Sequence, residues 1–170
     1  VMFAPSSPAP SWPPVSYELG AVRVTAFRTG AVAVKRAHRE YGGPSAFRLP
    51  AIVADPRWTP WLPVTCWLVE HPDGPILVDT GETARTSEAG YFDCDPGTAF
   101  VYERLLRFEV AKADEVGPQL QTFGIPPESI RTVVLTHLHS DHAGGLLHFP
   151  EATFLLSETE ARSPAPAALT

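Results

Sequence analysis

The sequence predicts one α/β domain, and three observations support this prediction. Apolar runs rich in β-branched residues alternate with segments of helical periodicity, an order typical of a sheet with flanking helices. A chain of 170 residues buries roughly 70% of its unfolded surface, which is enough for one core. Half of the six histidines directly follow one strand-like run, and such folds bind ligands at strand ends.

The composition excludes several classes of function. The hydrophobic share of 44% is that of a globular protein, and no apolar run approaches the ~20 residues of a membrane-spanning helix. The formal net charge of -6 comes without a stripe of Lys and Arg, so no nucleic-acid partner is expected. Two cysteines make no disulfide framework, and the start of the chain lacks the regions of a secretory signal. These features predict a cytoplasmic protein.

The first 60 residues fall into three segments of different composition. Five prolines among the first 14 residues predict an extended, disordered arm over residues 1–16. Rough alternation over residues 17–34 predicts one or two strands at a sheet edge. Residues 35–60 are rich in Arg, Gly and Pro and predict a long irregular loop.

The clearest β signal is LPVTCWLVEHPDGPILVDTG, residues 62–81. Two apolar runs flank the turn-forming cluster from His71 to Gly74, which predicts a hairpin. Cys66 lies inside the first run, where we expect a buried, reduced thiol. The second run ends at Asp79-Thr80-Gly81, and residues 82–100 are again irregular.

Helices are predicted over residues 101–108 and 113–123, with Gly124 as the stop of the second. The run RTVVLT, residues 131–136, predicts a buried strand, and another is expected over residues 153–156. The predicted domain therefore covers residues 17–160, and a disordered tail is expected over residues 161–170.

The histidine cluster LTHLHSDHAGG, residues 135–145, is the candidate functional site. His137 and His139 are two positions apart, so both imidazoles point to one side if the strand continues through them. Asp141 and His142 follow a turn and can approach from another direction to serve a second ion. Imidazole and carboxylate are ligands that zinc accepts. Alternatively, the histidines lie on an ordinary surface, and Ser140 or Asp141 caps a helix beginning at His142.

THLHSDHAGG, together with ILVDTG upstream, resembles the metallo-β-lactamase superfamily over roughly residues 62–157. The resemblance implies the first half of an αβ/βα sandwich with a mixed sheet and flanking helices. It implies that His137 and His139 hold one zinc ion, that Asp141 and His142 hold a second, and that Asp79 supports the site from behind the ligands. Asp79 could alternatively be an ordinary turn residue.

Within the superfamily, residues 62–81 and SEAGYFDCDPGTAFV most resemble the N-acyl homoserine lactonase group. The resemblance implies a lactone substrate opened by a hydroxide that zinc activates, with Asp141 as the proton donor. Tyr91, Phe92 and Phe100 would line a channel for the acyl chain, or simply pack the loop onto the sheet. A thioester hydrolase of the glyoxalase II type is the alternative enzyme, and its substrate would also be a small ester-like molecule.

The superfamily completes its site with downstream ligands, and no such pattern follows residue 148. Two protein ligands per ion predict weak metal binding, because a catalytic zinc usually has three. Half of a sandwich would also expose an apolar sheet face, which predicts self-association. A truncated interaction domain without catalysis is the alternative from another class.

Overall fold

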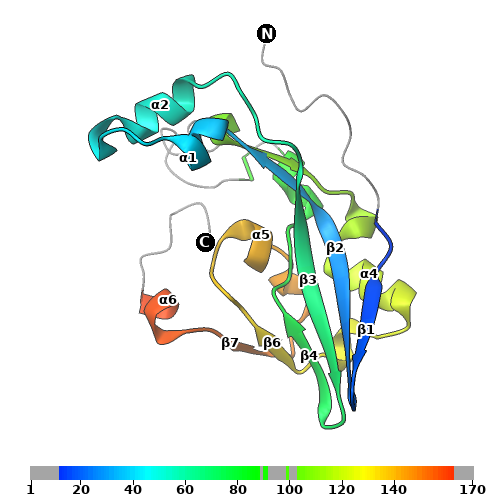
Figure 1. Cartoon of the computed structure of the whole chain (residues 1–170). Coiled ribbons are helices and arrows are strands. Elements are labelled where there is room, and N and C mark those ends of the chain that lie inside the picture. The colour runs from blue at the N-terminus through cyan, green and yellow to red at the C-terminus, as the bar shows by residue number, and fades with distance from the viewer. Residues whose placement is uncertain (1–11, 89, 92–98, 100–102, 163–170) are drawn as a thin grey trace.

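A computed structural model describes residues 12–88, 90–91, 99 and 103–162 of the chain, and Figure 1 shows its arrangement. A seven-stranded sheet in the order β1-β2-β3-β4-β6-β7, with β5 paired to β2, forms the centre. The strands are β1 (Val15–Leu19), β2 (Val22–Val34), β3 (Leu62–His71), β4 (Gly74–Val78), β5 (Leu106–Glu109), β6 (Thr132–Val134) and β7 (Thr153–Leu155). The first four strands run antiparallel, whereas β6 and β7 run parallel to β4, so the sheet is mixed as predicted.

Helices lie on one face of this sheet and beyond one of its ends (Figure 1). The α-helices are α1 (Arg36–Glu40), α2 (Arg48–Ala54), α4 (Val116–Phe123), α5 (Ser140–Ala143) and α6 (Glu158–Arg162). The 3-10 helices are η1 (Ser45–Phe47), η2 (Ala84–Ser87), η3 (Lys112–Asp114), η4 (Pro127–Ser129) and η5 (Leu146–His148). The helix α4 ends where Gly124 adopts a left-handed conformation with φ 91°, as the sequence predicted.

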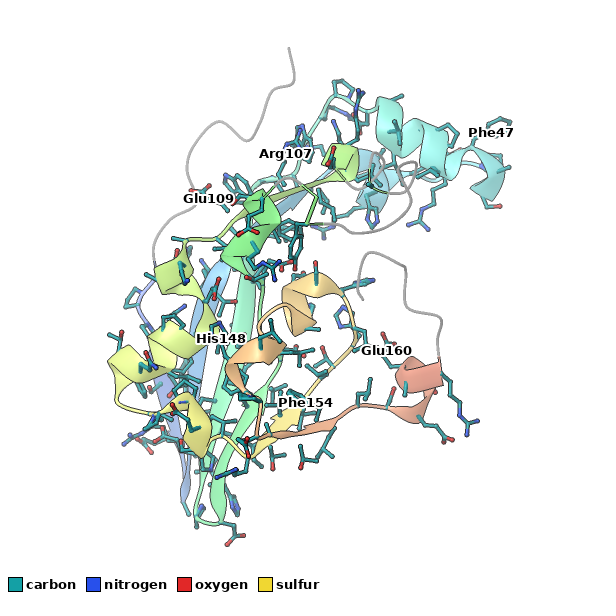
Figure 2. All side chains as sticks on the ribbon, turned by 180° about the vertical axis from the view of Figure 1, so that it is seen from behind. Phe47, Arg107, Glu109, His148, Phe154 and Glu160 are labelled. Carbon is teal, nitrogen blue, oxygen red and sulfur yellow. The ribbon has the colours of Figure 1, made fainter. Side chains whose placement is uncertain are left out.

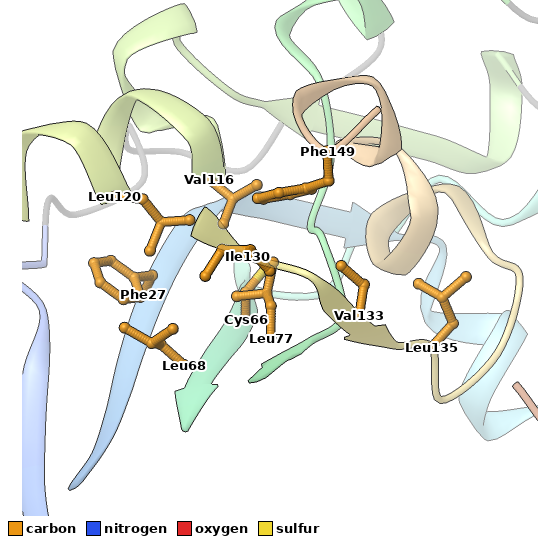
Figure 3. Close-up of a cluster of buried hydrophobic side chains, with 10 residues drawn as sticks. All are labelled: Phe27, Cys66, Leu68, Leu77, Val116, Leu120, Ile130, Val133, Leu135 and Phe149. Atoms are coloured by element: carbon orange, nitrogen blue, oxygen red, sulfur yellow. The ribbon is translucent and has the colours of Figure 1, made fainter. Parts of the chain in front are cut away.

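The core lies between α4 and the inward face of the sheet (Figure 3). Alternate residues of each strand point to this side, because successive side chains of a strand point to opposite faces. The buried cluster consists of Phe27, Cys66, Leu68, Leu77, Val116, Leu120, Ile130, Val133, Leu135 and Phe149. Burial raises the pKa of the Cys66 thiol to about 12, which confirms the expected unreactive, reduced cysteine.

The opposite face of the sheet carries an apolar row that crosses six strands. The register of the strands aligns its members in the order Val15, Ala26, Trp67, Val78, Val134 and Leu155. Trp67 is 41% exposed and Leu155 49%, so the described part of the chain leaves this row largely uncovered. We call this set the outer row.

The hairpin prediction for residues 62–81 is confirmed by β3 and β4, and the strands predicted at 131–136 and 153–156 are confirmed by β6 and β7. The strands predicted over residues 17–34 are confirmed as β1 and β2, but only β1 lies at the sheet edge, because β2 pairs with β1, β3 and β5. The strand β1 already begins at Val15, inside the expected arm. Residues 1–11 and 163–170 lie outside the described residues, and α6 extends to Arg162.

Two predictions of local structure were wrong. Residues 35–60 hold α1, η1 and α2 instead of an irregular loop, because the buried carboxylate of Asp55 ties these elements together. It accepts hydrogen bonds from the backbone of Ala37 at 2.8 Å and from the side chain of Arg57 at 2.9 Å. The helix predicted over residues 101–108 is confirmed at residues 103–105 but wrong from Leu106 onward, where β5 forms because pairing with β2 satisfies its backbone groups.

Candidate metal centre

The candidate site begins where β6 ends. The chain leaves the strand after Val134, passes through His137 and His139 without regular structure, and enters α5 at Ser140. His139 is the residue before the helix, and no side chain caps it. The alternative in which Ser140 or Asp141 caps a helix starting at His142 is therefore wrong.

The four predicted ligands lie together as two pairs of donor atoms. The Nε2 atom of His137 is 3.1 Å from the Nδ1 atom of His139. The Nε2 atom of His142 is 3.7 Å from the Oδ2 atom of Asp141. The rings of His137 and His142 connect the two pairs, with centroids 3.9 Å apart.

Asp79 holds this group in place through hydrogen bonds to His142 and Thr136. Its Oδ2 atom lies 2.8 Å from the Nδ1 atom of His142. Its Oδ1 atom accepts a hydrogen bond at 2.8 Å from the backbone N–H of Thr136, and the Thr136 hydroxyl lies 2.9 Å from Oδ2. Because these partners are 57 and 63 residues away, Asp79 is not a local turn residue despite its left-handed φ of 60°.

The electrostatics follow from these contacts. Burial alone would raise the pKa of Asp79, but hydrogen bonds from His142 and Thr136 lower it, so the carboxylate stays ionised. Burial lowers the pKa of His142, and the contacts with Asp79 and Asp141 outweigh it and raise the pKa. Burial and the neighbouring imidazoles lower the pKa of His137, which favours the neutral ring that can bind a metal.

The turn after β4 also holds α5 by its backbone, which the sequence analysis missed. The Thr80 backbone N–H donates to the carbonyl of His142 at 2.7 Å, and the Thr80 hydroxyl donates to the same carbonyl at 3.0 Å. The N–H of Gly145 donates to the Thr80 hydroxyl at 3.2 Å. A Cβ atom at Gly145 would collide with the Thr80 carbonyl, so the two backbones pass close to each other here. The only signal in the sequence was the position of Thr80 beside Asp79.

A second missed residue is Glu82, whose side chain is fully buried. Its Oε1 atom accepts hydrogen bonds from the Thr83 backbone at 2.9 Å and from the Tyr91 hydroxyl at 3.2 Å. Burial raises the pKa of this carboxyl to about 7, opposed by hydrogen bonds from Ser140, Thr83 and Tyr91, and the charge of Asp141 raises it further. Within the described residues, its Oε2 atom has no hydrogen-bond partner.

A cavity of about 770 Å³ borders α5. Its wall includes Ser140, Ala143 and Gly144, which share one face of the helix, whereas Asp141 and His142 point from the other. Tyr91 lines this cavity, and its hydroxyl donates a hydrogen bond to Glu82 at 3.2 Å. Phe92 and Phe100 lie outside the described residues.

His148, which also lines the cavity, is held by α4 (Figure 2). Its Nε2 atom lies 2.7 Å from the Oε2 atom of Glu115, whose other oxygen accepts a hydrogen bond from the backbone of Ala84 at 2.9 Å. A Cβ atom at Gly117 would contact the His148 ring. His148 therefore connects η5, α4 and η2, in agreement with the structural role expected for it.

The donor set can be compared with what zinc requires. Ligands of one tetrahedral zinc ion, bound at ~2.0–2.1 Å, lie roughly 3.3 Å apart. The two donor pairs, at 3.1 and 3.7 Å, bracket this spacing. Among residues 12–88, 90–91, 99 and 103–162, no three His, Cys, Asp or Glu side chains are arranged to hold one ion. The described residues thus offer two zinc sites, each with only two ligands: His137 with His139, and Asp141 with His142.

The fold therefore places two pairs of donors of the kind that bind metals at the end of a strand. The profile of the metallo-beta-lactamase superfamily matches residues 59–162, and the chain belongs to this superfamily. The chain is 39% identical over 101 residues to the N-acyl homoserine lactonase AiiA of Bacillus thuringiensis subsp. kurstaki, covering 58% of this chain and 38% of the relative. It is 38% identical over 96 residues to a probable metallo-hydrolase of Mycobacterium tuberculosis, covering 56% of this chain and 29% of that protein.

Solved structures agree with this assignment. AiiA from B. thuringiensis, with N-decanoyl-L-homoserine at its active site, superposes with a TM-score of 0.63 at 25% identity. That match covers 81% of this chain and 49% of AiiA. The dizinc quorum-quenching lactonase AidC shares the fold with a TM-score of 0.57 at 20% identity, covering 86% of this chain and 45% of AidC. The chain thus spans less than half the length of the curated relatives compared.

No described helix is long and apolar enough to cross a membrane.

Proposed function

We propose that this chain provides the first half of a dizinc site that opens the lactone ring of an acyl homoserine lactone. The observation that carries the proposal is the pair of donor sets at the end of β6, with His142 oriented by Asp79. The lactonase relatives support the substrate class, since AiiA is similar over 58% of this chain. The buried, reduced Cys66 is compatible with a cytoplasmic location.

His137 and His139 would hold one zinc ion, and Asp141 and His142 the other. The Nδ1 proton of His142 faces Asp79, so the lone pair of Nε2 is available to a metal. The Nδ1 atom of His137 lies 3.1 Å from the Thr136 hydroxyl, which leaves its Nε2 atom on the side of His139. Bound zinc would supply a strong nucleophile at neutral pH and would polarise the substrate carbonyl.

Hydrolysis adds one water molecule across the ester bond of the lactone. The hydroxyl of the water joins the carbonyl carbon, the ring C–O bond breaks, and the departing oxygen takes up a proton. We assign this proton transfer to the Asp141 carboxylate, which would take up the remaining proton of the water and pass it to the departing oxygen. Its side chain is 28% exposed and therefore accessible to substrate. Asp79 cannot serve in this role, because its carboxylate is buried and occupied by Thr136 and His142.

The test compares hydrolysis of N-hexanoyl homoserine lactone with hydrolysis of a glutathione thioester by zinc-loaded protein. Because the described residues supply only two donors to each ion, the proposal predicts slow turnover of the lactone and its loss in Asp141→Asn. Turnover of the thioester alone would establish the glyoxalase II type of reaction instead. A folded protein that retains no zinc and hydrolyses neither substrate would support the interaction domain.

A further inference from the structure

The turn after β4 contacts α5 at three successive points. The Asp79 side chain binds the imidazole of His142, and Thr80 binds the backbone of His142 and Gly145. The third contact is between Glu82 and Gly144. A Cβ atom added to Gly144 would lie 2.5 Å from the Oε1 atom of Glu82 and 3.0 Å from the Cα atom of Glu82. The backbone of α5 therefore rests directly on the Glu82 side chain.

Glu82 reaches the helix from the side opposite to the ligands. Ser140 and Gly144 are four positions apart and share one helical face, whereas Asp141 and His142 project from the opposite side. A movement of α5 toward the cavity would shift both ligands away from His137 and His139. Glu82 does not line the cavity, but it lies directly against Gly144 with its side chain 0% exposed, so it limits how far the helix can move on this side.

The Glu82 carboxyl is itself fixed by the neighbouring loop. Its Oε1 atom accepts hydrogen bonds from the Tyr91 hydroxyl and from the Thr83 backbone. A buried carboxyl with one oxygen lacking a partner is costly for folding, and an aliphatic side chain of similar size would avoid this cost. A residue retained only for packing has no need of a carboxyl here.

We infer that Glu82 is a positioning residue for the metal-binding helix, holding Asp141 and His142 in place through Ser140 and Gly144 while Tyr91 fixes the Glu82 side chain. The inference rests on the proposed function only for the claim that the site binds zinc. It does not depend on the identity of the substrate.

The experiment measures zinc affinity by calorimetric titration of the chain and its variants, together with circular dichroism and thermal unfolding without metal. Glu82→Ala removes the support, and Glu82→Gln keeps its shape and its hydrogen-bond acceptor. Glu88→Ala is the matched control, because Glu88 is an exposed carboxylate on the wall of the same cavity. Tyr91→Phe removes only the hydroxyl that binds Glu82.

We expect Glu82→Ala to weaken zinc binding about tenfold, the lower end of what is lost when residues supporting metal ligands are removed. Glu82→Gln should restore most of the affinity, Tyr91→Phe should cause a smaller loss, and Glu88→Ala should cause none. Folded Glu82→Ala protein with wild-type zinc affinity would overturn the inference. If Glu82→Ala does not fold, wild-type affinity in Tyr91→Phe would overturn it instead. A wild-type protein that binds zinc but hydrolyses no lactone contradicts the proposed substrate and leaves this inference standing.

Discussion

The Nδ1 atom of His142 lies 2.8 Å from the Oδ2 atom of Asp79, although 63 residues separate the two in the chain. This contact joins the end of β4 to α5 and sets the orientation of the imidazole. A carboxylate in this position also makes the ring a better metal ligand. The first prediction follows from this relationship.

Asp79→Asn should weaken zinc binding by about 10–100-fold, the range found when the partner of a metal-bound histidine is removed. Asparagine tolerates the φ of 60° at this position, so the substitution mainly removes the negative charge. Calorimetric titration with zinc provides the measurement, and Asp73→Asn in the exposed turn is the control. Equal affinities for Asp79→Asn and the wild-type protein would show that the contact does not support a metal.

Glu82 should make the metal-free protein less stable as the pH rises from about 4.5 to 7. Its pKa is about 7 in the folded protein and near the ordinary value of 4.5 in the unfolded chain, so the folded state binds the extra proton in this interval. The loss should be about 3 kcal/mol in the free energy of unfolding. Urea denaturation at pH 5 and pH 8 measures it.

The matched variant for this pH effect is Glu82→Gln, which cannot ionise. It should lose clearly less stability than the wild-type protein between the two pH values. Identical losses in both proteins would place the pKa of Glu82 near its ordinary value.

Gly81→Ala should destabilise the protein by about 2 kcal/mol or more. Gly81 has a φ of 70°, and an added Cβ atom would collide with the side chain of Thr29 and lie 3.1 Å from the Sγ atom of Cys66. Thermal and urea unfolding measure the loss, with Gly20→Ala as the control. Gly20 has a similar φ of 66° but open space around it, so it reports the backbone strain alone. Equal losses at the two positions would mean that the packing under the turn is loose.

The outer row should make the chain self-associate, because its apolar side chains from six strands lie side by side and three of them, Val15, Trp67 and Leu155, are exposed. Trp67→Glu places a charge in the middle of this row and should shift sedimentation toward the monomer. Leu147→Glu is the control, since Leu147 is 84% exposed on the helical side of the sheet. A wild-type chain that sediments as a monomer at high concentration would contradict this prediction.

The sequence was sufficient for the hairpin, for the strand before the histidines and for the cluster itself. These features depend on local patterns: alternation, β-branched runs and a turn between them. The family resemblance added the assignment of ligands to pairs.

Other features depended on contacts between distant residues. The helices at 36–54 are short and lack side-chain caps, and Asp55 stabilises them through a contact that no local pattern reveals. The strand β5 exists because β2 is long enough to pair with it beyond the end of β1. The roles of Thr136, Thr80 and Glu82 likewise appear only once β4 and β6 lie side by side.

The central claim is that the four side chains form two separate donor pairs for divalent cations. Zinc titration of the wild-type chain, His139→Ala, His142→Ala and the control His71→Ala tests this most directly. We predict up to two ions for the wild-type and control proteins, and the loss of a different ion in each of the other variants. If all four proteins bind the same amount of zinc with the same affinity, these residues do not form the metal centre.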